Sequence, residues 1–280
     1  MSVIVLTMGD RLRELDELVE SLASQQPFDG VLVGNGITPP TYDGWRSIVL
    51  TENVGISAGR GHGAANATGD LLAFIDDDAK NLTPDLFART TSAFAEDPNL
   101  GAIAMRVVVE GTDRSPSEWQ PRIRGRKQHT PGDVTAFHGA AHVVRATAYQ
   151  QVGGYPDNFW YAHEETDLAW RILDTGQRIA YRPDLKLSHP DTKPSRHNKH
   201  LWFSARNRVW LARKNLPLPI ALVYVLTWLG IQLVRTRSID EIKGVLGGSL
   251  AGLRQSPGTR SPMSWNTVAR MTRLGRPPLI

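Results

Sequence analysis

The chain has 280 residues, of which 41% are hydrophobic and 21% are charged, and its formal net charge is +4. These values exclude a disordered chain and predict a globular protein with a sizeable core. The sequence contains no cysteine, which excludes disulfide bonds and thiolate metal sites. The region from Arg235 onward is rich in arginine, which favours contact with phosphates or an anionic membrane surface. We find no nucleic-acid-binding motif and expect no nucleic acid partner.

Apolar runs and helical periodicity alternate through the first 110 residues. Short apolar runs predict strands, and residues 10–25 carry leucines at helical spacing. The expected order is strand 3–7, helix 10–25, strand 31–33, strand 48–50, helix 57–67, strand 71–75, helix 82–94 and strand 101–109. This alternation predicts an α/β fold with parallel strand pairs.

The second half of the chain is less regular. Its polar, basic segment 110–133 predicts a loop or flexible insertion, with Arg114, Arg122, Arg124, Arg126 and Lys127. After it we expect β structure at 134–144, helices at 146–152 and 164–176, and a strand at 179–182. Beyond residue 211 the chain becomes a helical appendage, first apolar and then basic.

Three consecutive aspartates, Asp76, Asp77 and Asp78, follow the apolar run 71–75. Adjacent carboxylates repel one another and destabilise a fold unless their charge is compensated. A divalent cation that carries a phosphate would compensate it, and ligands bind at the open ends of strands in α/β sheets. The triplet therefore indicates a metal–nucleotide site. The alternative is an acidic turn in which Asp78 or Asn81 caps the following helix.

Glu164, Glu165 and Asp167 form a second acidic cluster, at a predicted helix N-terminus. The helix dipole favours acids there, which by itself accounts for Asp167. Three carboxylates within four positions exceed what capping requires. A carboxylate beside a nucleotide site can accept the proton of an attacking hydroxyl, so the cluster supplies a candidate general base.

His189 lies between the strand at 179–182 and a basic stretch. Its imidazole is a candidate metal ligand, although a lone histidine is more often a surface or satisfied core residue. The basic stretch is either a solvated face or a mobile cover whose arginines contact diphosphate. Its members are Lys193, Arg196, His197, Lys199, His200, Arg206 and Arg208.

The order of these motifs is more specific than any one of them. In chain order they are Thr7, Gly34-Asn35-Gly36, Asn53-x-Gly55, Gly59-Arg60, Asp76-Asp77-Asp78, Gly153-Gly154-Tyr155, Glu164-Glu165-Thr166-Asp167-Leu168 and His189. Over residues 2–215 this series resembles glycosyltransferase family 2, whose members are inverting enzymes that use nucleotide-diphosphate sugars. The resemblance implies a GT-A fold, a Rossmann-like mixed sheet flanked by helices. We therefore divide the chain into a GT-A catalytic domain, 1–210, and a C-terminal helical appendage, 211–280.

The resemblance also implies roles for individual residues. Those it places at the nucleotide are Thr7, Asn35, Asn53, Gly55, Arg60, Asp76, Asp77 and Arg206. Asp78 and His189 would bind Mn²⁺ or Mg²⁺, and Glu165 would be the catalytic base, with Glu164 as its substitute. Two departures from the family pattern stand out. The turn at 34–36 lacks the usual aspartates, which leaves the nucleotide base open, and the base position holds Glu where Asp is usual.

The acceptor is not readable from the sequence, and saccharide, lipid-linked and small-molecule acceptors all remain open. The activity would serve cell-envelope polysaccharide, glycolipid or natural-product biosynthesis. Rival interpretations are a sugar-phosphate nucleotidyltransferase and a non-catalytic nucleotide-sugar-binding protein. The former would need a basic, glycine-rich N-terminal loop, of which the chain has little.

The segment 216–234 has no charged residue and is near the shortest length that spans a membrane. We expect a buried helix, a peripheral contact with the membrane surface or a homodimer interface there. The N-terminal apolar run lacks a basic region before it, so we expect no signal peptide. The expected location is the cytoplasm, with peripheral attachment to the inner face of the membrane as an open alternative.

Overall fold

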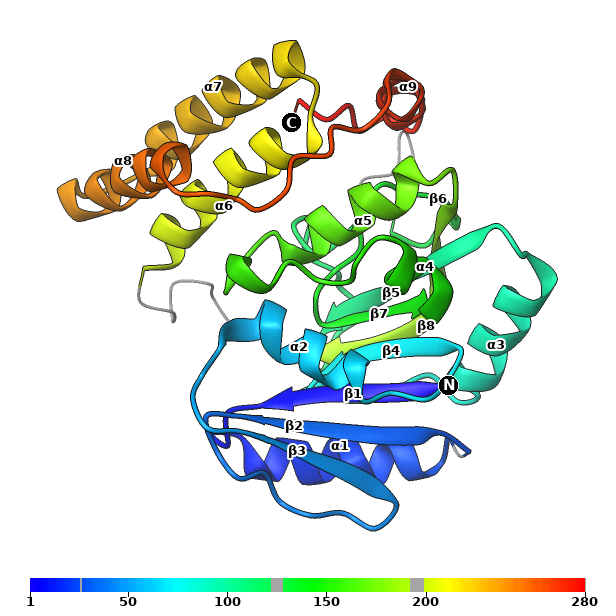
Figure 1. The fold of residues 1–280 in the computed structure, drawn as a ribbon. Coiled ribbons are helices and arrows are strands. Elements are labelled where there is room, and N and C mark those ends of the chain that lie inside the picture. The colour runs from blue at the N-terminus through cyan, green and yellow to red at the C-terminus, as the bar shows by residue number, and fades with distance from the viewer. Residues whose placement is uncertain (26, 122–127, 192–198, 280) are drawn as a thin grey trace.

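The computed structural model describes residues 1–25, 27–121, 128–191 and 199–279 (Figure 1). Part of the predicted insertion, with Arg122, Arg124, Arg126 and Lys127, lies outside the described residues. The same holds for Lys193, Arg196 and His197 of the basic stretch.

Within the described part of the chain, eight strands form one mixed sheet (Figure 1). In spatial order they are β3 (Trp45–Leu50), β2 (Asp29–Asn35), β1 (Ser2–Thr7), β4 (Leu71–Asp76), β7 (Ala141–Arg145), β5 (Leu100–Val109), β8 (Arg178–His189) and β6 (Gly132–Asp133). β1 to β4 are parallel, whereas β7 runs antiparallel between β4 and β5. Because β8 is parallel to β5, it points the same way as β4.

This topology brings distant segments to one edge of the sheet. β1 pairs with β2 on one side and with β4 on the other, so the strand order reverses between β1 and β4. Crevices at such reversals, outside the carboxyl ends of the strands, are where ligands bind in α/β sheets. The ends of β1, β4 and β8 all open on this edge.

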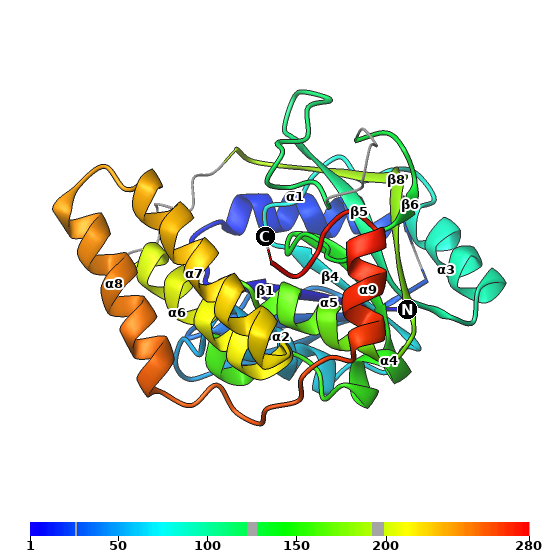
Figure 2. The same ribbon diagram turned by 90° about the horizontal axis from the view of Figure 1, so that it is seen from above.

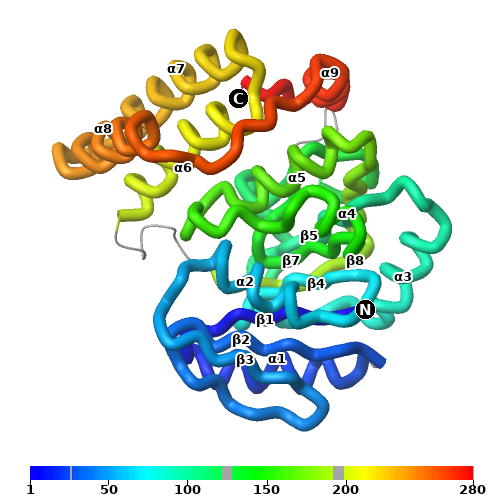
Figure 3. Tube along the Cα trace, in the orientation of Figure 1, coloured from blue at the N-terminus to red at the C-terminus, as the bar shows by residue number. Residues whose placement is uncertain are grey.

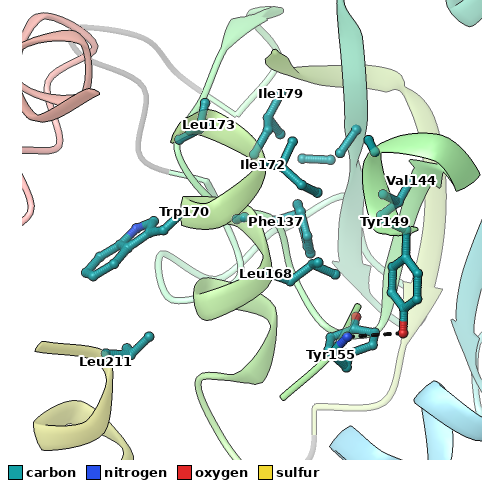
Figure 4. Packing of buried hydrophobic residues seen from close by; sticks show 14 of the residues in the cluster. Phe137, Val144, Tyr149, Tyr155, Leu168, Trp170, Ile172, Leu173, Ile179 and Leu211 are labelled. Carbon is teal, nitrogen blue, oxygen red and sulfur yellow. Dashed lines mark hydrogen bonds between the residues drawn. The ribbon is translucent and has the colours of Figure 1, made fainter. Parts of the chain in front are cut away.

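Helices cover both faces of the sheet because strand side chains alternate. On β4, Ala73 and Ile75 face the α1 (Leu12–Ala23) and α3 (Leu86–Glu96) side, whereas Leu72 and Phe74 face the opposite side. The opposite side carries α2 (Gly55–Ala65), α4 (Ala146–Gln151), the 3-10 turn η1 (Asp157–Phe159) and α5 (Glu164–Asp174). Figure 4 shows the packing there, where Leu168 and Ile172 of α5 lie against Phe137. The predicted α/β sheet flanked by helices is confirmed.

Four further helices form the C-terminal region: α6 (His200–Asn215), α7 (Leu218–Arg235), α8 (Ile239–Arg254) and α9 (Trp265–Arg273). Figure 2 shows α6, α7 and α8 side by side, and Figure 3 shows the chain returning past α6 to place α9 near the end of α5. The predicted boundary between residues 210 and 211 falls inside α6. Asn207 on that helix donates to the carbonyl oxygens of Phe159, Tyr161 and Ala162, so α6 is fastened to the sheet domain.

Several element predictions differ from the structure. The strand predicted at 179–182 continues to His189, because it pairs with β5 along nearly its whole length. The β structure expected at 134–144 is confined to β7. The helix expected from residue 82 begins at Leu86, since Asn81 and Asp85 are left-handed, with φ of 52° and 57°. The N-cap of α3 is therefore Asp85, and the alternative in which Asp78 or Asn81 caps this helix is wrong.

Candidate active site

A carboxylate–imidazole cluster lies where β4 and β8 end. Asp76 closes β4, Asp78 follows two residues later, and His189 closes β8. One ligand atom from each lies within 4.8 Å of the others. His189 Nε2 is 3.0 Å from Asp78 Oδ1 and 3.6 Å from Asp76 Oδ2. The structure thus brings Asp78 and His189 together, and it adds Asp76 as a third donor that we had expected beside the nucleotide.

The donor set of this cluster fits a divalent cation. Two carboxylates and an imidazole are compatible with Mn²⁺ or Mg²⁺. Asp78 is fully buried, and its Oδ1 faces the His189 imidazole at 3.0 Å. A carboxyl group buried in this way needs a donor or a cation beside it, a need that the His189 imidazole or a bound metal ion meets.

The ionisation of the cluster is set by its own contacts. Burial opposes the charge on Asp76, but Arg60 and His189 outweigh it and hold the pKa of this carboxyl well below its usual range. Burial also opposes the charge on His189, yet Asp76 and Asp78 raise its pKa to about 10. The imidazole is therefore charged at neutral pH when only the aspartates face it.

Residues from the end of β1 complete this edge. Arg11 forms an ion pair with Asp78 and lies 3.3 Å from Asp77, and Thr7 is hydrogen-bonded to Asp77. Burial raises the pKa of Asp77 to about 7, although Thr7 and Arg11 oppose this rise. Sequence reasoning had assigned no role at the aspartates to Arg11. The signal that could have found it is that Arg11 lies just after β1, the strand beside the switch point.

Arg60, on α2, connects the aspartates with the second acidic cluster. Its Nη2 donates to Asp76 Oδ1 at 2.6 Å and to the Gly139 carbonyl oxygen at 2.7 Å. Its Nη1 lies 3.7 Å from Glu164 Oε1 and has no hydrogen-bond partner among the described residues. Arg60 is buried between the two acidic clusters, so its charge acts on both of them.

Glu164 and Glu165 open α5 after an unusual stretch of backbone. Trp160, Ala162 and His163 all have positive φ, at 60°, 69° and 70°. Residues other than glycine rarely adopt such conformations, and they concentrate at functional sites. The turn places both glutamates next to Arg60.

The two glutamates form a coupled carboxyl pair. Their side chains are hydrogen-bonded to each other, and one Oε2 atom of each is buried without a partner among the described residues. Burial and the neighbouring Glu165 raise the pKa of Glu164 to about 8, against the effect of Arg60. Burial likewise raises the pKa of Glu165. A carboxylate with a raised pKa is the stronger proton acceptor, which suits a general base. Asp167, by contrast, is buried in contacts with Arg171 and Asn215.

The residues expected beside the nucleotide base and ribose are joined by hydrogen bonds and close packing. Asn35 Nδ2 donates to Asn53 Oδ1 at 3.0 Å, and Asn35 Oδ1 accepts from the Val54 amide at 2.9 Å. Gly55 has φ of +85°, and a Cβ there would lie 2.5 Å from the Trp160 carbonyl oxygen. These residues shape the loop between β3 and α2, and their contact with a nucleotide stays a prediction.

Arg206 contacts backbone carbonyl oxygens and an aromatic ring. Its Nη2 donates to the carbonyl oxygens of Asn158 and Phe159 at 3.2 and 2.9 Å. Its guanidinium lies 4.0 Å from the centre of the Trp210 ring, and burial lowers its pKa to about 10. These contacts support the turn before α5. The role of Arg206 at a phosphate stays a prediction.

Two aromatic residues that the sequence did not single out, Trp119 and His138, lie near His189. Trp119 lies edge-on to it, with ring centres 5.5 Å apart, and also contacts His138. Burial lowers the pKa of His138 to about 4, so this second imidazole is neutral. Only the folded chain brings residue 119 beside residue 189.

A cavity of about 780 Å³ lies between the start of α6 and the start of α8. Trp202 and Phe203 line it with apolar surface. Phe203 stacks on Trp160 with ring centres 4.8 Å apart, and Ser204 Oγ is 3.1 Å from His163 Nε2. The cavity therefore adjoins the turn that leads directly into the glutamate pair.

Comparisons with known proteins agree with this architecture. The family model for glycosyl transferase family 2 matches residues 2–153. A glucosyl-dolichyl phosphate glucuronosyltransferase of Haloferax volcanii is 28% identical over 217 residues, which span 68% of each chain. A pre-mycofactocin glycosyltransferase of Mycobacterium tuberculosis is 30% identical over 176 residues, 57% of this chain and 33% of that protein. The match thus spans only a third of the mycobacterial relative.

Solved structures share the fold at low sequence identity. The S. aureus TarS 1–349 structure has a TM-score of 0.62 at 16% identity and covers 90% of this chain and 80% of its own. GalNAc-T7, solved with UDP, GalNAc and Mn²⁺, has a TM-score of 0.65 at 12% identity, covering 91% and 56%. The mannosyltransferase PcManGT from Pyrobaculum calidifontis, solved with GDP-Man and Mn²⁺, reaches 0.56 at 18%, covering 98% and 83%. Together with the family match, these likenesses establish that the chain belongs to glycosyltransferase family 2 and is a glycosyltransferase with the GT-A fold.

Proposed function

We propose that this enzyme transfers a sugar from a nucleotide-diphosphate donor to an acceptor hydroxyl, with a divalent metal and with inversion of configuration. The observation that carries the proposal is the connection, through Arg60, between the Asp76–Asp78–His189 cluster and the Glu164–Glu165 pair. A metal site and a proton acceptor thereby meet at the switch-point edge, where donor diphosphate and acceptor hydroxyl would be side by side.

Asp76, Asp78 and His189 would hold the metal. A bound Mn²⁺ or Mg²⁺ would supply neutralisation of the charge that develops on the leaving diphosphate. Arg11, paired with Asp78, and Arg60, paired with Asp76, add positive charge near the same point. Solved neighbours bound to Mn²⁺ with UDP or GDP-Man support such a donor, without choosing between the bases.

Glu165 is the proposed base, with Glu164 as its coupled neighbour. In its ionised form Glu165 accepts the proton of the acceptor hydroxyl as that oxygen bonds to the anomeric carbon. The bond from this carbon to the diphosphate breaks on the opposite face, and the diphosphate leaves with the electron pair. A single displacement of this kind inverts the anomeric configuration.

We place the acceptor at the cavity between α6 and α8, because it adjoins the turn before the glutamates. Trp202 and Phe203 offer apolar and stacking surface for a sugar or for the apolar part of a carrier. The Haloferax relative, by its name, acts on a dolichyl phosphate glycolipid, which supports a lipid-linked acceptor of cell-envelope or glycolipid biosynthesis. A cytoplasmic enzyme that touches the inner face of the membrane would meet such an acceptor.

The decisive experiment measures sugar transfer and donor hydrolysis with a panel of nucleotide sugars, with Mn²⁺ and after chelation. We expect one donor to be consumed, turnover to cease on chelation and to return with Mn²⁺, and Asp78→Asn to abolish it while the circular dichroism spectrum is retained. Full activity of Asp78→Asn would contradict the metal assignment. Release of pyrophosphate from a nucleoside triphosphate would favour the nucleotidyltransferase instead, and no turnover of any donor would favour a binding protein.

A further inference from the structure

Helix α8 has two opposite faces of different character. Gly244, Gly248 and Gly252, four residues apart, face α6, and a Cβ at Gly248 would overlap the Trp202 carbonyl oxygen. The other face is apolar and exposed, and its large side chains, with their exposed fractions, are Ile239 (71%), Ile242 (39%), Leu246 (48%), Leu250 (45%) and Leu253 (58%). Glycine thus draws α8 close to α6 while the bulky residues point outward.

Helix α7, beside α8 in Figure 2, also exposes large apolar side chains. They are Leu218 (73%), Leu222 (62%), Val223 (47%), Leu226 (59%) and Val234 (88%). Of the 18 residues of this helix, only Ala221 and Tyr224 are buried. We call these five residues and the five of α8 the α7–α8 face. Apolar patches of this extent on soluble proteins mark contact surfaces.

The inner side of α7 is fastened to α6 by polar and aromatic contacts. Arg208 on α6 donates to the Tyr224 hydroxyl at 3.3 Å and lies 3.4 Å from the centre of the Trp228 ring. Gln232 Nε2 donates to Ser204 Oγ at 3.4 Å. At 18 residues the helix is about 27 Å long, slightly short of the hydrocarbon core. These contacts hold α7 along the surface of α6. A helix that lies on a membrane can keep such contacts with its own domain, whereas a spanning helix would have to leave them.

The charge near the α7–α8 face indicates whether protein or lipid would bind there. From residue 235 to the end of α8 at residue 254, the chain has four basic and two acidic residues, a net charge of +2. Arg235 and Arg237 lie exposed between the two helices, and Lys243 and Arg254 flank the apolar side chains of α8. A second copy of this chain would bring like charges together, whereas anionic lipid headgroups would neutralise them.

We propose that the α7–α8 face binds peripherally to an anionic lipid bilayer, with its leucine, isoleucine and valine side chains in the headgroup–acyl boundary and its arginines at the phosphates. The cavity between α6 and α8 then lies beside the membrane surface. This inference concerns binding of the protein to lipid and does not depend on the donor chemistry proposed above.

The test is flotation of the full chain with vesicles of phosphatidylcholine alone and of phosphatidylcholine with about one third phosphatidylglycerol. We expect binding to the anionic vesicles, reduced when salt is raised from about 0.1 M to about 0.5 M. Leu226→Ser with Leu250→Ser should weaken binding about tenfold or more. Arg237→Gln with Arg254→Gln should weaken it mainly at low salt.

The matched control is Leu12→Ser with Val49→Ser, which removes two side chains of similar exposure, 49% and 52%, from the sheet domain. This variant should bind vesicles like the wild type, and the melting temperature of each variant shows that the fold is retained. Equal binding by all variants, or none by the wild type, would overturn the proposal. So would resistance to alkaline extraction, which indicates a spanning helix, or a vesicle-free dimer that Leu226→Ser with Leu250→Ser dissociates.

Discussion

At the residue scale, the two acidic groups of the site differ in how readily they lose a proton. Arg60 and His189 keep Asp76 ionised, whereas burial and mutual contact favour a proton on the Glu164–Glu165 pair. Arg60 forms ion pairs with both groups. Its charge therefore acts on Asp76, which stays ionised, and on the glutamate pair, which gains and loses a proton. In the proposed mechanism, this division separates charge stabilisation from proton transfer within one crevice.

The glutamate pair yields a prediction for activity and for pH. Glu165→Gln should lower kcat by about a hundredfold or more with donor binding retained, because the base is lost. In the wild type the base must be ionised, so kcat/KM should rise with pH as the pair loses its proton. Glu164→Gln, which leaves Glu165 in place, should retain more activity and shift this rise to lower pH. Steady-state kinetics over pH 5 to 9 checks both, and wild-type kcat in Glu165→Gln would refute the assignment.

The same pair affects folding stability, which offers an independent check. Glu164 binds its proton more tightly in the folded state, where its pKa is about 8, than at its ordinary value of 4.5. Its contribution is therefore complete below pH 4.5 and is lost as pH rises toward 8, by at most about 1.4 kcal/mol per pH unit. Denaturant unfolding should show this slope in the wild type and a flatter one in Glu164→Gln.

At the element scale, glycines decide how closely helices and loops approach. Gly55 lets the start of α2 lie against Trp160, and Gly248 lets α8 lie against α6. Both contacts support the same region, since Trp160 stacks on Phe203 of α6 and directly precedes the turn to the glutamates. Helix packing in the C-terminal region is thereby connected to the position of the glutamate pair.

A pair of glycine substitutions tests this connection. Gly248→Ala should destabilise the protein by about 1–3 kcal/mol, because the new Cβ meets backbone of α6. Gly230→Ala on α7 meets nothing within 4 Å and should stabilise it by about 0.5–1 kcal/mol. Urea unfolding measures both free energies. Equal effects of the two substitutions would contradict the close packing of α6 and α8.

At the scale of the whole molecule, the C-terminal region is bound back to the sheet domain at both ends of α5, and through Asn215 to Asp167 within it. Asn207 holds the turn before α5, and at the other end of α5 Asp174 accepts from the Ser264 amide and the Thr267 hydroxyl. Arg270 of α9 also donates to the carbonyl oxygens of Gly176 and Gln177. These contacts join the two predicted domains through α5, the helix that carries the proposed base.

The joined arrangement predicts one cooperative unfolding transition in calorimetry. Removal of residues 260–280 should lower Tm by about 5 °C or more, because the contacts of α9 with the end of α5 are lost. Asp174→Ala should lower it by a smaller amount, and Asp240→Ala, whose side chain is 92% exposed, should leave it unchanged. Two separate transitions in the full chain would instead show that the C-terminal helices unfold on their own.

The sequence by itself determined the α/β alternation, the aspartate motif and the family, because strand periodicity and the order of motifs can be read along the chain. Whether Asp76 turns toward Asp78 and His189, and which cations face them, depended on strand order and register, which join residues more than a hundred positions apart. Arg11, Trp119 and the two faces of α8 therefore became visible only in the tertiary structure. There, parallel strands end at one edge and glycine allows one helix to pack closely on another.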